Sequence, residues 1–525
     1  MLKNNKIAVF DSTLRDGSQA RGITFSPADR IHLVEILDTL GVDYIEAGNP
    51  ASNPKEALFF KEVQNLKLTT SKIVAFGSTR RKNSDVQTDS GVKSLLEANT
   101  PAVAIFGKCW DLHVTEVLGA TLDENILMVE ETVAFFKAQG KEVIFDAEHF
   151  FDGYQANPDY AMRVLAAAHK GGADSLALCD TNGGTMPFDV QKIVKLVVDT
   201  FSDVTIGIHC HNDCGMAVAN SVMAVNVGAR QVQGTLIGFG ERCGNACLTS
   251  LIGDLQIKMG YDCIPDNNLK SLTTTAHRVA ELANIILDEK LPYVGVDAFA
   301  HKGGMHIDGV SKVQSSFEHI NPSQVGNHRE FLLSEVAGRS ALVNKMQAQY
   351  PLLTRDAKET QELMQQLKEL EQNGYHFEGA ESSFELIVKR YLEKYEPYFK
   401  LEHFKIIDES AGGSEGGLTS YTVVKMNVNG QLKISAAEGN GPVNALDKAL
   451  RGALQEFYPA LLNIHLVDYK VRVLDTTSAT EAKVRVIIET TDGINSWSTV
   501  GVSTDVIEAS LIALQDAIEY KLACL

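Results

Sequence analysis

Eight short runs rich in β-branched residues recur along the first half of the chain, and this rhythm constrains the fold more than any other feature. The runs lie at 6–12, 43–48, 72–77, 102–107, 142–150, 175–183, 204–213 and 232–240. Amphipathic stretches with helical spacing, such as 27–41 and 187–201, separate them. Eight strand–helix repeats predict a closed (β/α)8 TIM barrel. An open doubly wound sheet is the alternative, and it is disfavoured because such sheets usually have fewer strands.

Polar residues gather where the predicted strands end. The ends read DSTLRDG, YIEAGNP, FDAEHF, LCDTNGG, HCHND and GFGERCGNA. In a TIM barrel the C-terminal ends of all strands face one shared mouth. We therefore expect the active site at this mouth.

The histidine pair at the end of the seventh run indicates a metal site. Residues i and i+2 of a strand share a face, so His209 and His211 can point together while Cys210 points the other way. With a carboxylate such as Asp16, two neutral imidazoles suit a divalent Mn, Zn, Co or Fe ion. The same face has no second thiolate, which disfavours a closed structural zinc site. A simple polar pair at a strand exit is the alternative.

Composition limits the partners and the compartment. The 525-residue chain has a formal net charge of -19 and no long basic stripe, which argues against nucleic-acid and membrane-surface partners. No N-terminal apolar core resembles a signal peptide, and no apolar run approaches the ~20 residues that span a bilayer. The eight cysteines form no CxxC pair. A cytoplasmic protein with reduced thiols is expected.

The second half of the chain has a different organisation. A stretch at 312–395 rich in Glu, Gln, Leu and Lys predicts helices, and a Gly-rich turn follows at 410–417. Two similar units then follow, each with strands of alternating polarity and then an amphipathic helix. The two helices begin at Pro442 and Asp505, and the repetition suggests duplication. The predicted domains are a barrel at 1–270, a mainly helical connector at 271–400 and an α+β regulatory domain with an internal repeat at 401–525.

Three motifs carry a resemblance to a known family: LRDGSQ at 14–19, HCHNDCGMAVAN at 209–220 and GERCGNA at 240–246. They resemble the metal-dependent acyltransferases and lyases that include the isopropylmalate, homocitrate and citramalate synthases. Longer stretches, such as YIEAGNPASNPKEALFF and IFDAEHFFDGY, are most similar to the long bacterial form of the citramalate synthases. The resemblance covers essentially the whole chain.

The resemblance implies a metal-assisted Claisen condensation. An acyltransferase of this family would join acetyl-CoA, pyruvate and water into (R)-citramalate and CoA, the first step of a threonine-independent route to isoleucine. The cofactor would be a divalent Mn, Mg, Zn or Co ion. Its implied ligands are Asp16, His209, His211 and Asn245, although Asn245 could instead be a turn residue after Gly244.

Other residues receive roles from the same resemblance. Arg15 would stabilise the developing alkoxide, since a guanidinium stays protonated and offers two donors; a surface salt bridge is the alternative. Thr181 and Gln19 would bind the keto acid. Glu148 would orient substrate and water, unless it only caps a helix.

The resemblance also implies a site completed by a second subunit. His306 matches a family histidine that reaches into the neighbouring active site as the base, or as the group that organises it, with Asp308 orienting it. The alternative is a histidine in a polar loop. A homodimer with crossed subdomains follows. Synthases of this group commonly carry a tyrosine shortly afterwards, where this chain has Phe317, and His319 is the candidate substitute.

Regulation and specificity leave alternatives open. Small and hydroxyl residues at the predicted helix starts near 438–446 and 500–511 could accept a carboxylate, and the resemblance implies isoleucine as a feedback inhibitor. A purely structural dimerisation module is the alternative. A 2-isopropylmalate synthase that uses 2-ketoisovalerate and responds to leucine is the second function, because one methylene is worth only ~1–3 kcal/mol to a pocket. Candidate pocket walls are Asn49, Phe76 and Trp110.

Two functions of other classes are disfavoured. A lyase would share the metal motif, but such lyases usually stop after the barrel. An amino-acid sensor without catalysis would have no reason to keep Arg15, Asp16 and both histidines.

Overall fold

The computed structural model separates into two compact units. The barrel unit comprises Met1–Phe299 and Ile320–Arg329, and the C-terminal unit comprises Ala300–His319 and Glu330–Leu525. The structure describes residues 5–332, 346, 350, 354, 357–377, 380–393, 396–410, 418–474, 482–493 and 495–524. Each unit is described by itself.

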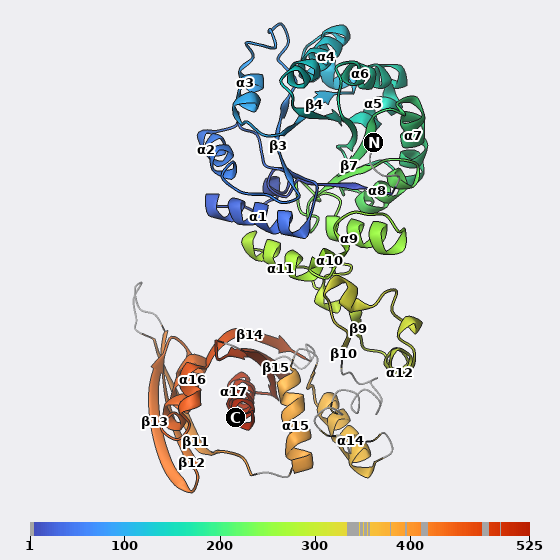
Figure 1. Cartoon of the computed structure of the whole chain (residues 1–525). Helices are drawn as coiled ribbons and strands as arrows, with labels where there is room; N and C mark the ends of the chain where they lie inside the picture. The colour runs from blue at the N-terminus through green and yellow to red at the C-terminus, as the bar shows by residue number, and fades with distance from the viewer. Residues whose placement is uncertain are drawn as a thin grey trace. The chain divides into compact units, whose positions relative to one another are not determined.

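The barrel unit is a closed parallel barrel of eight strands in sequence order (Figure 1). The strands are β1 (Ala8–Asp11), β2 (Tyr44–Glu46), β3 (Lys72–Ser78), β4 (Ala102–Lys108), β5 (Glu142–Glu148), β6 (Ser175–Asp180), β7 (Thr205–Cys210) and β8 (Gln231–Gly234). β8 closes on β1, with Val232 opposite Val9. The predicted TIM barrel is confirmed, and the open-sheet alternative is wrong.

Helices surround the strands. They are α1 (Pro27–Leu40), α2 (Pro54–Val63), α3 (Ser90–Glu97), α4 (Leu122–Ala138), α5 (Phe150–Ala156), α6 (Pro158–Lys170), α7 (Pro187–Thr200), α8 (Ala217–Asn226), α9 (Leu248–Ile252), α10 (Asp266–Leu269) and α11 (Leu272–Leu282). Local sequence sets their ends. Ser26 and Asp29 form a capping box at the start of α1, and Gly41 ends this helix with a φ of 94° that only glycine adopts readily.

Two apolar layers stabilise the barrel. A small cluster that includes Phe10, Val74 and Ile144 packs together from different strands. A much larger cluster joins the other strand residues, such as Val9 and Ile208, to the helices. Because both faces of the strands are buried, these runs are apolar almost throughout, as expected for a parallel barrel.

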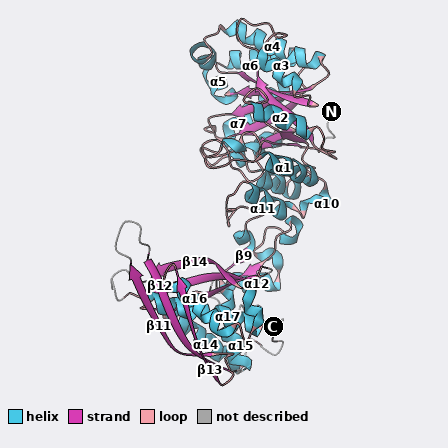
Figure 2. Ribbon diagram, turned by 90° about the vertical axis from the view of Figure 1, so that its left-hand side faces the viewer, coloured by secondary structure: helices cyan, strands magenta, loops and turns pink. Residues whose placement is uncertain are grey.

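The C-terminal unit contains the predicted repeat (Figure 2). The first half is β11 (Lys400–Ser410), β12 (Leu418–Val428), β13 (Gln431–Gly439) and α16 (Pro442–Leu454). The second is β14 (His465–Val473), β15 (Val484–Thr491), β16 (Ser496–Ser503) and α17 (Val506–Ala523). Each half is a three-stranded antiparallel sheet and a helix, and one core joins them.

Further elements precede this repeat. They are β9 (Ala300–His301), α12 (Gly304–Lys312), β10 (Glu330–Phe331), α14 (Lys358–Gln372) and α15 (Glu381–Glu393). Parts of the predicted helical connector, and residues 411–417 of the predicted Gly-rich turn, lie outside the described residues. Within the described residues, no helix combines the length and apolarity that a bilayer crossing requires.

Candidate active site

A cavity of about 250 Å³ lies at the mouth of the barrel where the strands end. Most of the predicted site residues line it: Arg15, Asp16, Gln19, Glu148, Thr181, His209 and His211. They come from the turn after β1 and from the ends of β5, β6 and β7. The expectation that the strand ends converge on one site is therefore confirmed.

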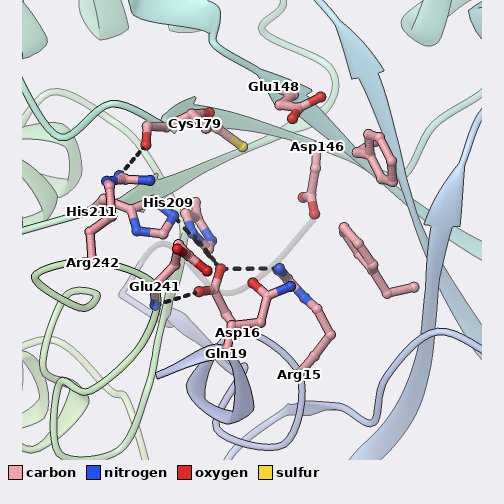
Figure 3. Close-up of a pocket in the computed structure, with 13 residues that line it drawn as sticks. Arg15, Asp16, Gln19, Asp146, Glu148, Cys179, His209, His211, Glu241 and Arg242 are labelled. Carbon is pink, nitrogen blue, oxygen red and sulfur yellow. Dashed lines mark hydrogen bonds and ion pairs between the residues drawn. The ribbon is translucent and has the colours of Figure 1, made fainter. Parts of the chain in front are cut away.

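Asp16, His209 and His211 form a compact cluster in this cavity (Figure 3). Asp16 Oδ2 lies 3.6 Å from His209 Nε2 and 3.7 Å from His211 Nε2. All three candidate ligand atoms lie within 4.8 Å of one another, and all three residues are buried. Cys210, between the histidines, is fully buried in the core around the strands. The alternation predicted for this strand is thus present.

The imidazole of His209 is oriented by an amide on the neighbouring strand. His209 Nδ1 lies 2.9 Å from Gln233 Oε1, and Gln233 Nε2 donates to Asp146 Oδ1 at 3.0 Å. Because the amide nitrogen of Gln233 donates to Asp146, its amide oxygen faces His209, and the Nδ1 of His209 therefore carries the proton. This tautomer leaves the lone pair of Nε2 directed at Asp16, as a metal ligand requires.

Asn245 lies against Asp16. Its Nδ2 donates to Asp16 Oδ1 at 3.0 Å, and its buried Oδ1 has no hydrogen-bond partner within the described residues. Gly240 packs so closely here that an added Cβ would lie 2.1 Å from Asn245 Nδ2. A buried amide oxygen without a donor beside a carboxylate and two imidazoles is a donor set that fits a divalent cation.

The protonation states of the cluster suit metal binding. Burial lowers the pKa of His209 to about 4, with His211 adding to the effect. Burial likewise lowers the pKa of His211. Burial opposes ionisation of Asp16, but Arg15 and the two histidines outweigh it and hold the pKa of Asp16 below its usual value. At neutral pH the cluster is one carboxylate and two neutral imidazoles.

Arg15 is fixed by two carboxylates and a ring. Its Nε donates to Glu46 Oε2 at 2.7 Å, and its Nη1 donates to Asp16 Oδ2 at 3.0 Å. The guanidinium carbon lies 4.0 Å from the ring centre of Phe76. Burial raises the pKa of Glu46, and the charge of Arg15 opposes this effect. Arg15 is therefore part of a largely buried network, and the alternative of a surface salt bridge is wrong.

Glu148 ends β5 and Thr181 directly follows β6, whereas Arg15 follows β1, four strands away from β5 in the closed barrel. Glu148 Oε2 pairs with Lys108 Nζ at 2.5 Å. The following helix, α5, has His149 at its N-cap and no side-chain cap, so the capping alternative for Glu148 is wrong. Thr181 Oγ1 accepts from the backbone N–H of His149 at 2.8 Å, which leaves its own proton available as a donor.

The cavity wall differs in part from prediction. Phe76 lines the cavity, as does Phe106, whose ring stacks on Phe76 at 5.1 Å. Asn49 and Trp110 do not line it: Asn49 accepts a turn hydrogen bond from Ala51, and Trp110 stacks on His113 at 5.2 Å.

His306 lies outside the cavity lining, on α12 of the C-terminal unit. It is exposed, and its ring stacks on Phe317 with centres 4.1 Å apart and planes 22° apart. The polar-loop alternative is wrong because His306 is helical. The phenylalanine that replaces the expected tyrosine thus contributes a flat apolar face to His306.

Sequence reasoning missed several residues of the site. Glu46 and Gln233 orient Arg15 and His209, and Asp146 supports Gln233. Arg242, within the GERCGN motif, donates to the backbone oxygen of Thr181 at 2.7 Å and pairs with Asp213. The signal was position alone, since Glu46 and Asp146 both stand at strand ends.

Three protein-family models match consecutive parts of the chain. The HMGL-like family model matches residues 6–279, a homocitrate synthase post-HMGL domain-like model matches 293–375, and the LeuA allosteric (dimerisation) domain matches 378–522.

Curated relatives match along nearly the whole chain. The (R)-citramalate synthase of Aquifex aeolicus is 52% identical over 98% of both chains. That of Synechocystis sp. is 46% identical over 100% of this chain and 97% of the relative. A probable 2-isopropylmalate synthase of Methanopyrus kandleri is 30% identical over 97% of each chain.

Proposed function

The chain belongs to the HMGL-like family and, within it, to the (R)-citramalate synthases, and we propose that it condenses acetyl-CoA with pyruvate and water to give (R)-citramalate and CoA. One observation carries the proposal: a relative with this activity in its name is 52% identical over 98% of the chain. The candidate ligand cluster that lines the barrel cavity supports it. A base takes a proton from the acetyl methyl group, and the methyl carbon bonds to the keto carbon while the C=O π bond opens to an alkoxide, which takes up a proton. Water then cleaves the thioester C–S bond and gives the carboxylate and the thiol of CoA.

Asp16, His209 and His211 would hold a divalent ion, with Asn245 as a further ligand through its Oδ1. When bound, such an ion supplies Lewis-acid polarisation of a keto acid that approaches it. The neutral imidazoles and the ionised Asp16 need no proton exchange to bind it. We propose that this ion is Mn, Mg, Zn or Co.

Arg15 holds a charged donor beside the reacting carbonyl. Its guanidinium is fixed by Glu46 and Asp16, so it need not reorganise when the keto oxygen takes up negative charge. Thr181, with a free hydroxyl proton, and Gln19 would bind the carboxylate of the keto acid. Glu148 would orient the substrate and the water that hydrolyses the thioester.

The base that removes the methyl proton would be His306 of a second copy of the chain. Two features support this part of the proposal: His306 is exposed, and the chain carries a LeuA allosteric (dimerisation) domain. A homodimer with crossed subdomains would place each His306 at the cavity of its partner.

The same domain supports feedback control. We propose isoleucine as the inhibitor, because it is the amino acid to which a citramalate product would lead. Inhibition of the condensation by isoleucine tests this assignment, and leucine, measured in parallel, is the control. Stronger inhibition by leucine would contradict the assignment.

A thiol-release assay tests the reaction directly. Acetyl-CoA is offered with pyruvate, 2-ketoisovalerate or 2-ketobutyrate, and we expect the highest kcat/KM with pyruvate and loss of turnover after chelation. Preference for 2-ketoisovalerate would identify an isopropylmalate synthase instead. Full turnover in metal-stripped buffer would overturn the metal-assisted reaction.

A further inference from the structure

The segment that contains His306 is the helix α12, Gly304–Lys312. His306 and Gly309 are three positions apart, so they lie on the same side of this helix. Gly309 is inside the helix, where glycine is a poor helix former and where the chain needs no left-handed backbone. The reason for a glycine at this position therefore lies in what packs against the helix.

The ring of Phe317 packs on this glycine. A Cβ added at Gly309 would lie 2.6 Å from Phe317 Cε2 and 2.9 Å from Phe317 Cδ2, so a larger residue would have to push the ring away. The same ring stacks on His306, with centres 4.1 Å apart and planes 22° apart. Gly309 and Phe317 thus form a seat for the imidazole, which we call the His306 seat.

A buried polar contact fixes the chain beside Phe317. Glu318, the next residue, has its Oε1 3.2 Å from Nε2 of His301 on β9, and both side chains are buried. Phe317 itself is 44% exposed, and His306 is exposed as well. The two stacked rings are therefore open to an approaching partner, while the backbone that carries Phe317 is anchored.

The stack restricts the direction of the His306 side chain. Histidine has two rotatable side-chain bonds, and a flat ring against one face of the imidazole leaves few combinations of them. In the described part of the chain, the rings near His306 are those of Phe317 and, with centres 6.5 Å apart, His301. Asp308, the residue predicted to orient His306, has its Oδ2 2.6 Å from Lys312 Nζ. Of the two rings, only that of Phe317 is close enough to stack.

We propose that Phe317 is a positioning residue, which sits on Gly309 and holds the imidazole of His306 in the direction from which it enters the cavity of a second copy of the chain. This inference rests on the proposed function, in which His306 takes the proton of the acetyl methyl group there. A base that is already oriented loses less freedom on the way to the transition state, so the ring should raise kcat more than it improves substrate binding. Only the face of the ring is used, and a phenol hydroxyl is not required.

Nuclear magnetic resonance of the histidine-labelled full chain tests the stack without turnover. A phenyl ring over the imidazole shifts the carbon-bound ring protons of His306 upfield, and the loss of this signal in His306→Gln identifies it. We expect the signal to move downfield in Phe317→Leu and in Gly309→Ala, because the added methyl group displaces the ring. Alanine favours a helix, so a loss of helical structure cannot explain a change in Gly309→Ala. Phe188→Leu, at an exposed phenylalanine on α7, is the control and should leave the signal unchanged.

Steady-state kinetics measure the consequence for the reaction. In Phe317→Leu, kcat should fall at least about tenfold with little change in the KM of pyruvate, since misplacement of a reacting group lowers turnover by such factors. Phe317→Tyr keeps the ring and should restore both kcat and the upfield shift. Phe188→Leu should turn over like the wild type.

Three results would overturn the positioning role. They are an unchanged His306 signal in Phe317→Leu, a lost stack with a normal kcat, and a loss of kcat that Phe317→Tyr does not restore. The proposed base has a separate test. If His306→Gln condensed pyruvate at the rate of the wild type, the base would be refuted and the positioning role with it. A slow His306→Gln chain together with a fully active Phe317→Leu chain would retain the base and reject the His306 seat alone.

Discussion

His209 on β7 and Gln233 on β8 are register partners, and their side chains meet at 2.9 Å between Nδ1 and Oε1. Since Gln233 is itself held by Asp146, the direction of two hydrogen bonds fixes which nitrogen of His209 faces Asp16.

Gln233→Leu removes the acceptor that fixes the His209 tautomer. Because partners of metal-binding histidines typically contribute 10–100-fold to affinity, we expect the Kd of Mn²⁺ to rise by about that factor. Titration of the metal-free protein measures it. Gln64→Leu, at an exposed position after α2, is the control and should bind normally. Equal affinity in wild type and Gln233→Leu would show that the amide plays no part.

Gly240→Ala disturbs Asn245 and Asp16 by volume alone. The added Cβ would lie 2.1 Å from Asn245 Nδ2 and 3.3 Å from Asp16 Oδ1, so Asn245 has to move. We expect metal affinity to fall at least about tenfold, as on loss of a supporting contact. Gly184→Ala, whose Cβ would meet no atom within 4 Å, should leave it unchanged. An unchanged metal affinity in Gly240→Ala would show that Asn245 is not part of the metal site.

Arg15→Lys keeps the charge but cannot reproduce both Arg15 contacts, because an ammonium lacks the fork that reaches Glu46 and Asp16 together. We expect kcat to fall on the order of 10²-fold with a much smaller change in the KM of the keto acid. Steady-state kinetics with Arg163→Lys, an exposed ion pair with Asp123, as control decide the question. Equal losses in kcat and in affinity would assign Arg15 a binding role only.

Asp146→Asn should change how stability depends on pH. Burial, with Glu46 adding to it, raises the pKa of Asp146 to about 7. Between its usual value of 3.8 and about 7 the folded state retains a proton that the unfolded state has released, so this residue lowers wild-type stability as pH rises. Asparagine cannot ionise and still accepts from Gln233.

Urea unfolding of the metal-free protein between pH 4 and 8 measures the effect. Relative to the wild type, the Asp146→Asn variant should gain up to about 1.4 kcal/mol per pH unit across this window. Asp159→Asn, on the outer helix α6, is the control. A pH-independent difference between Asp146→Asn and wild type would mean that Asp146 titrates alike in both states.

Periodicity was sufficient to predict the barrel and its metal cluster. A period of two residues put His209 and His211 on one face, and the common direction of parallel strands brought Asp16 to them. These inferences need only strand identity and strand order. They do not depend on the exact register between neighbouring strands.

The supporting residues depend on that register. Gln233 meets His209 because β8 is paired with β7 at those positions, and Glu46 meets Arg15 through a turn whose path the sequence does not specify. Wall residues raise the same difficulty: Phe76 points into the cavity, whereas Trp110, beyond the end of β4, turns toward His113. A large side chain near a strand end is therefore insufficient evidence for a pocket wall.

The hydrogen bond from Gln233 to Asp146 has a consequence for metal exchange. An amide has one donating end and one accepting end, so folding alone sets the aim of the His209 lone pair. Replacement of one divalent ion by another would then require no rearrangement of His209. Which ion binds would depend on the ions available in the cell and on the keto acid that binds beside the ion.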